Sequence, residues 1–170
     1  MMMQRVKQFY MNVTSKVTHD DRIFIENYLN KNEMKLFYNL SISEQCHSVR
    51  VAKDIKKYLD NKNEYLKYKF HKKELIRVAL LHDIGKIKCH LNVFEKSILV
   101  LLDKFTKGRL KNFKSIKKVN VYYNHGIMGE DILNKMRYSE RFLYLVKNHH
   151  NNDIIGDMEL DILKKCDDRN

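Results

Sequence analysis

Apolar positions along the chain recur at the three- and four-residue steps of an α-helix and do not alternate as they would in a strand. The pattern is clearest between residues 44 and 59, where Val51, Ile55 and Leu59 form one stripe. No alternating run and no Asn–Gly or Asp–Gly hairpin signal interrupts it. The sequence therefore predicts an all-α fold, built as a helical bundle.

Seven further helices are predicted, and short polar stretches separate them. They cover residues 20–29, 34–40, 72–82, 94–105, a segment after His125 through Met136, 139–150 and 159–168. Asp20–Asp21 and Ser41 are expected to cap helices. The segment 72–82 is the most apolar, so we expect it at the centre of the bundle, with Gly85 ending it.

Histidines and aspartates form a spaced series along these helices. Its members are His47, His82, Asp83, His125, His149, His150 and Asp167. Imidazole and carboxylate groups are ligands of divalent transition metals, and seven exceed what one tetrahedral site needs. Two ions sharing a ligand are therefore predicted. Asp83 is the best candidate for the shared ligand, because a carboxylate has two oxygens and can bridge two ions.

Net charge and cysteine content limit which partners and which cellular compartment are expected. The net charge of +12 suits an anionic partner such as a nucleotide, a nucleic acid or an acidic membrane, although lysine-rich composition also simply favours solubility. The three cysteines show no short repeated spacing, which argues against a disulfide framework. No secretory signal pattern opens the chain, and the longest apolar run is far below the roughly 20 residues that span a bilayer. A cytoplasmic location is predicted.

These residues, in this order, resemble the HD superfamily of metal-dependent phosphohydrolases, and more closely its HDIG branch. The resemblance is carried by residues 45–52 around His47, residues 79–86 with the His82–Asp83 pair, residues 125–129, the pair His149–His150, and Cys166–Asp167. It implies an all-α, HD-domain-like bundle with a central metal site. The chain would be one domain over residues 1–170, with residues 1–40 as a helical extension packed on a metal-binding core at 41–170.

The resemblance also implies how the ligands divide. His47, His82, Asp83 and Asp167 would hold the first metal, and Asp83, His125, His149 and His150 the second. Asp168 lies next to Asp167, so the identity of the last ligand stays open. Manganese or iron is expected, with cobalt, nickel and zinc as alternatives. Lys86 is expected to contact a substrate phosphate, and Arg50 to contact the anion or to orient Asp83.

The function expected on this basis is hydrolysis of a phosphate ester, a monoester or a diester, of a nucleotide or related metabolite. A metal-bridging hydroxide would attack phosphorus, with Asp83, Lys86 and Arg50 as the catalytic residues. The chain lacks the Gly–Tyr–Pro segment of the HD-GYP group, which argues against cyclic dinucleotides. The alternatives are an HD-fold di-iron oxygenase and a non-catalytic, metal-stabilised binding or signalling module. The expected partner is a small anionic phosphorylated substrate; a nucleic acid is not favoured, and no membrane partner is expected.

Overall fold

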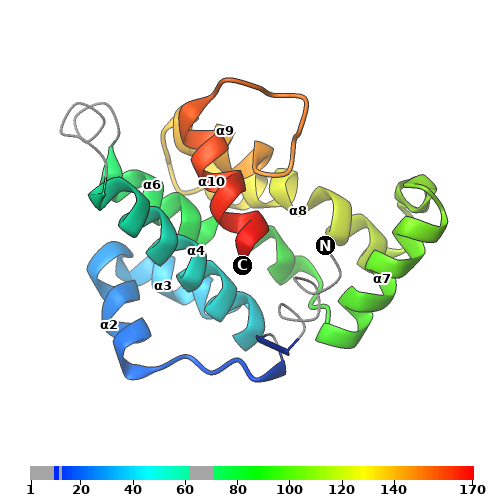
Figure 1. Ribbon diagram of the computed structural model, residues 1–170, viewed down its shortest axis with the longest axis horizontal. Coiled ribbons are helices and arrows are strands. Elements are labelled where there is room, and N and C mark those ends of the chain that lie inside the picture. Colours follow the sequence, from blue (N-terminus) through cyan, green and yellow to red (C-terminus); the bar gives the residue numbers. More distant parts are fainter. Residues whose placement is uncertain (1–9, 12, 62–70) are drawn as a thin grey trace.

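The computed structural model describes residues 10–11, 13–61 and 71–170, and within these ranges the fold consists of helices without strands (Figure 1). The all-α prediction is confirmed. The α-helices are α2 (His19–Tyr28), α3 (Lys31–Phe37), α4 (Ile42–Asp60), α6 (Lys72–Leu81), α7 (Val93–Phe105), α8 (Lys117–Asn134), α9 (Glu140–Asn148) and α10 (Met158–Arg169). Two 3₁₀-helices, η1 (Ile84–Lys88) and η2 (Arg109–Asn112), follow α6 and α7.

The bundle is organised around α4 and α6, which pack along each other, and around α8, which packs on both η1 and α9. Helix α10 lies across α4, whereas α7 stands at one end of the molecule (Figure 1). Leu80 and Phe142 are fully buried in the main hydrophobic core, which confirms the central position predicted for the segment 72–82. None of the described helices is long and apolar enough to cross a membrane.

Side-chain caps begin several helices. Ser41 caps α4 through a capping box with Glu44, as predicted. The first helix differs from the prediction, because its N-cap is Thr18, and Asp21 sits at the third helical position, where its carboxylate accepts from the Thr18 backbone N–H. Each cap satisfies backbone N–H groups that the first turn leaves without a helical acceptor.

Gly85 does not end α6 in the way predicted. The helix ends at Leu81, and Gly85 lies inside η1 without the positive φ that a C-terminal glycine cap requires. A Cβ at Gly85 would lie 1.9 Å from the His125 carbonyl oxygen and 2.8 Å from the Gly129 nitrogen. Gly85 therefore lets η1 touch the backbone of α8, which aligns the segment carrying Asp83 with the helix carrying His125.

Close contact through Gly126 and Gly129 also joins α8 to α9. A Cβ at Gly126 would lie 2.5 Å from the Lys147 carbonyl oxygen, and one at Gly129 would lie 3.1 Å from the Val146 side chain. Helix α8 is longer than predicted, since it begins at Lys117. Val119 and Val121 are buried on its first two turns, in a stretch whose many basic residues hide the helical period.

Candidate metal centre

The seven metal-ligand candidates come together in the middle of the bundle, although five different parts of the chain carry them. Their ligand atoms form two groups, and within each group the atoms lie within 4.8 Å of one another. One group consists of His47 from α4, His82 from the end of α6, and Asp167 from α10. The other consists of Asp83, His125 from α8, and the pair His149 and His150 at the end of α9.

Asp83 lies between the two groups and turns one oxygen towards each. Its Oδ2 is 3.8 Å from His47 Nε2 and 3.6 Å from His82 Nε2. Its Oδ1 is 3.2 Å from His125 Nε2 and 3.7 Å from His149 Nε2. This is the placement that a carboxylate needs in order to bridge two ions.

Asp167 also reaches both groups, which the sequence did not indicate. Its Oδ1 is 2.7 Å from His47 Nε2, and its Oδ2 is 3.7 Å from His150 Nδ1. Asp168, the alternative that the sequence left open, is exposed and does not belong to either group. The structure thus brings Asp167, and not its neighbour, into the cluster.

Three of the imidazoles are oriented by their own helices. His82, His125 and His149 each place Nδ1 at the backbone carbonyl three residues earlier, at 2.7, 3.0 and 2.6 Å respectively. A carbonyl can only accept, so Nδ1 carries the proton, and Nε2 of the neutral ring presents a lone pair to the cluster. His125 Nε2 and His149 Nε2 lie 3.2 Å apart. Two acceptors at this distance cannot bond to each other, and a shared cation would resolve the contact.

The donor set fits divalent metal ions on a second ground. His82 and Asp83 are fully buried, yet His82 Nε2 and Asp83 Oδ1 have no hydrogen-bond partner. Buried polar atoms are rarely left in this state, because desolvation without a partner is costly. Nitrogen and oxygen ligands of this kind suit divalent transition metals, so these residues fit the two metal ions predicted from the sequence.

The charges keep most of these groups in the form that binds metal. Burial alone would raise the pKa of Asp83, but Lys86 and His82 hold it well below its usual range. Burial would likewise raise the pKa of Asp167, and the hydrogen bond from His47 together with the nearby charge of His82 holds it well below that range. Burial, with the nearby charge of Lys86, lowers the pKa of His125 to about 4. Both carboxylates are therefore ionised and His125 is neutral at pH 7.

Two lysines interact electrostatically with the cluster, and the sequence predicted one of them. Lys86 is buried, with its Nζ 2.5 Å from Asp83 Oδ2. Lys96 on α7 was not predicted; its pKa is lowered, first by the charge of Lys86 and then by burial, and Asp83 opposes the shift. The sequence could not single out Lys96, because its direction depends on how α7 packs against the rest of the protein.

The structure does not place Arg50 at the cluster. The ionisable groups that act on the Arg50 guanidinium are Cys46 and Asp21, and burial lowers its pKa. Its buried Nε and one of its Nη atoms have no hydrogen-bond partner. No hydrogen bond or ion pair joins Arg50 to Asp83 among the described residues, and its contact with a substrate anion stays a prediction.

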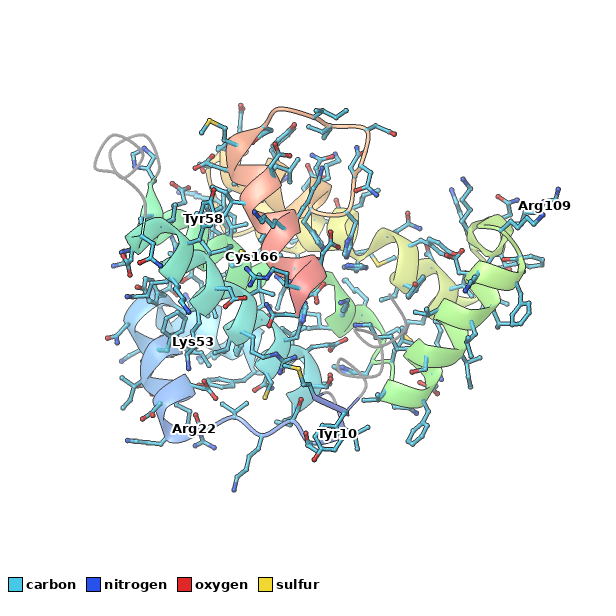
Figure 2. The ribbon with its side chains drawn as sticks, in the orientation of Figure 1. Tyr10, Arg22, Lys53, Tyr58, Arg109 and Cys166 are labelled. Atoms are coloured by element: carbon cyan, nitrogen blue, oxygen red, sulfur yellow. The ribbon has the colours of Figure 1, made fainter. Side chains whose placement is uncertain are left out.

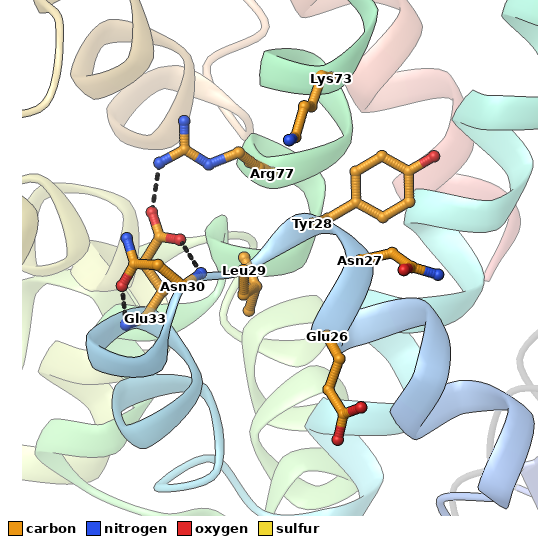
Figure 3. A pocket seen from close by; sticks show the side chains of 8 residues that line it. All are labelled: Glu26, Asn27, Tyr28, Leu29, Asn30, Glu33, Lys73 and Arg77. Carbon is orange, nitrogen blue, oxygen red and sulfur yellow. Dashed lines mark hydrogen bonds and ion pairs between the residues drawn. The ribbon is translucent and has the colours of Figure 1, made fainter.

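A surface pocket on the other side of α6 carries further polar residues, but these are structural. The pocket lies between α2, α3 and α6 and includes Glu33, Lys73 and Arg77 (Figure 3). The buried Glu33 carboxylate accepts from Arg77, from the Asn30 backbone N–H at 2.7 Å and from the Tyr138 hydroxyl at 2.6 Å. With three donors, this carboxylate needs no ligand.

Fold and cluster together define an all-α protein with a buried His–Asp centre suited to divalent metal ions. The family model described as "HD domain" matches residues 45–168, which is most of the chain. The chain therefore belongs to the HD domain family, whose members are largely metal-dependent hydrolases. No curated protein and no solved structure matches it.

Proposed function

We propose that this protein is a metal-dependent phosphohydrolase of the HDIG branch that cleaves a phosphate ester of a nucleotide or related metabolite. The observation that carries the proposal is the pair of imidazole nitrogens, His125 Nε2 and His149 Nε2, that face each other 3.2 Å apart while both Nδ1 atoms are occupied by carbonyls. Such an arrangement is costly in an all-protein core and is typical of a metal site.

Asp83 would be shared by two metals. His47, His82 and Asp167 would complete the first set, and His125, His149 and His150 the second. The division follows the two oxygens of Asp83, which point to different groups. His150 has a side chain that is 54% exposed, whereas those of the other six are largely buried. The second set is therefore the one that opens to solvent and to substrate.

The metals would supply a water acidic enough to attack phosphorus at neutral pH. The chain itself supplies positive charge beside that position. Lys86 and Lys96 carry like charges that interact with each other, and an anionic phosphate between them would relieve that repulsion. The two lysines would hold the phosphoryl group against the cluster and stabilise negative charge that develops on its oxygens.

Metal analysis and a substrate panel test the proposal. Protein purified without chelators is expected to hold about two divalent ions per chain and to hydrolyse at least one compound in a panel of nucleotides, phosphomonoesters and phosphodiesters. His82→Ala should lose metal and at least about 100-fold in activity, because even losing a residue that only orients a metal ligand costs about 10- to 100-fold. His90→Ala is the matched control, since His90 is exposed and lies outside both ligand groups.

Other results would favour the alternative functions. Turnover that requires iron and oxygen, without activity under anaerobic conditions with manganese, indicates a di-iron oxygenase. A protein that binds two metals yet hydrolyses nothing in a broad panel is a metal-stabilised binding module. Either result overturns the proposed phosphohydrolase activity.

A further inference from the structure

Helix α7 carries large apolar side chains on its solvent-facing side. Lys96, Leu99 and Asp103 turn towards the protein, and Asp103 accepts a hydrogen bond from Tyr123. The opposite face carries Ile98, Leu101, Leu102 and Phe105, with exposed fractions of 54%, 55%, 43% and 83%. Their spacing of three, four and seven residues is that of a stripe that would normally be buried. We refer to these four residues as the α7 outer face.

The α7 outer face is uncovered because α7 lies at the end of the molecule. The helix packs against η2 and α8 through a small cluster formed by Leu99, Leu110 and Val119 (Figure 1). A continuous exposed apolar patch of this kind marks an interaction site more often than chance exposure of single residues does.

The same end of the molecule is strongly basic. Residues 93–118 contain eight lysines and arginines and two acidic residues. Their net charge of +6 is half of the net charge of +12 of the whole chain. Seven of the eight are exposed: Lys104, Lys107, Arg109, Lys111, Lys114, Lys117 and Lys118. Arg109 lies at the outer tip of this end (Figure 2). We refer to residues 104–118 as the basic segment.

We propose that the α7 outer face and the basic segment together form a docking surface for an anionic lipid bilayer. The apolar side chains would enter the boundary between headgroups and acyl chains, and the basic segment would contact acidic headgroups. It differs from the sequence-based expectation of no membrane partner. The proposal does not depend on the metal centre, since it uses the opposite face of α7 from Lys96.

Area and charge disfavour the other occupants. The α7 outer face exposes on the order of 400 Å² of apolar surface, about half of what each partner contributes to a stable protein interface. A second copy would also bring two basic segments together. Single-stranded RNA would match the charge, but three of the four outward side chains are aliphatic and cannot stack on bases. A bilayer matches both the apolar stripe and the positive charge.

Tryptophan fluorescence tests insertion directly, because the chain contains no Trp. Phe105→Trp places one reporter on the α7 outer face, and Ile155→Trp places a matched one on a distant loop where Ile155 is 89% exposed. With phosphatidylcholine vesicles containing about one third phosphatidylserine, the Phe105→Trp emission should shift to the blue and be quenched by brominated acyl chains. The Ile155→Trp emission should not change. Equal behaviour of the two reporters, whether both shift or neither does, overturns the proposal.

Matched charge variants test the basic segment. Lys107→Ala/Arg109→Ala/Lys111→Ala should reduce the affinity for these vesicles, measured by co-sedimentation, at least about 10-fold, since each lysine or arginine near an anionic surface contributes about fivefold. Lys31→Ala/Lys35→Ala/Lys57→Ala removes the same charge from exposed lysines elsewhere and should retain binding. Circular dichroism checks folding of both. Equal losses overturn the proposal, as does a dimer in light scattering that Leu101→Ala/Phe105→Ala dissociates without any vesicle binding.

Discussion

Two regions of the molecule depart from the rule that polar groups face water and apolar groups face the core, and they do so in opposite senses. The metal centre buries His82, Asp83 and Asp167 among helices. The α7 outer face exposes Leu101 and Phe105 to solvent. Buried polar groups without partners and exposed apolar patches are both uncommon when nothing binds, and they support the two proposals above, of a cation in the first case and an apolar surface in the second.

Glu33 shows that burial of a charge alone does not mark a binding site. Its carboxylate is as buried as Asp83, at 1% against 0% exposed, yet it accepts from three donors of the chain. Asp83 has a buried oxygen without any hydrogen-bond partner. The difference lies in what remains unsatisfied once the fold has formed, and this criterion separates a structural charge from a candidate ligand.

The largest expected effect on the metal centre comes from Gly85→Ala. Its Cβ would overlap the His125 carbonyl, and backbone atoms of α8 cannot move aside without displacing His125. We expect a loss of more than about 4 kcal/mol in the free energy of unfolding, measured in urea, or failure to fold. Gly108→Ala is the control, since its Cβ would meet nothing and only the positive φ is strained, which costs about 1 kcal/mol. Similar losses for both variants would contradict the close η1–α8 contact.

Metal removal should have the next largest effect. At a free metal concentration of one hundred times Kd, the metal-loaded protein should be about 3 kcal/mol more stable than the chelated protein. Burial would lower the pKa of His82, but Asp83 and Asp167 raise it overall. Protons therefore compete with metal first at His82, and because this pKa is raised, the gain should already shrink as the pH falls from about 8 towards about 6.5.

Thermal unfolding with manganese and with chelator, at pH 8 and pH 6, measures this difference. A gain that is the same at both pH values would show that the imidazoles do not hold the metal. Leu101→Ala/Phe105→Ala should show the same metal dependence as the unchanged protein, because the α7 outer face lies outside the cluster.

Much of the metal centre could be predicted because its residue types are rare in a helical core. His47 shares a stripe with Val51 and Ile55, so its inward direction follows from helical spacing alone. The order of the other histidines and aspartates then indicated one cluster, and the structure brings them together. The all-α fold followed from the same periodicity.

What could not be predicted depends on contacts between helices. The reach of Asp167 to both ligand groups depends on how α10 crosses α4, and the inward direction of Lys96 depends on how α7 meets α8. Helical spacing predicted a helix over residues 94–105 but not the exposure of its apolar residues, because periodicity does not say which face a neighbour covers. The sequence predicts Gly85 as a helix stop, because a glycine that lets two backbones come close together looks the same in the local sequence.

A smaller effect is expected inside α7. Leu99→Ala should cost about 2 kcal/mol, at the low end for a buried leucine, because Leu99 belongs to a cluster with only two other buried residues. Leu102→Ala removes the same atoms from the exposed face of the same helix and should cost less than about 0.5 kcal/mol. Urea unfolding of both variants without lipid measures the difference. If Leu102→Ala were the more costly change, the outward orientation of Leu102 and the inward orientation of Leu99 would be wrong.

The smallest effect is expected at Glu33, whose buried carboxylate already has three donors within the chain. Tyr138→Phe removes one of three donors to Glu33, and we expect a loss of about 1 kcal/mol, because the carboxylate keeps its contacts with Arg77 and the Asn30 backbone. Tyr144→Phe is the matched control: Tyr144 is half-buried and lies outside this network. Bound metal should be unchanged in both variants, as measured by elemental analysis. A loss of metal in Tyr138→Phe would mean that Glu33 is coupled to the cluster, and the distinction between a satisfied and an unsatisfied buried carboxylate would no longer separate structure from function.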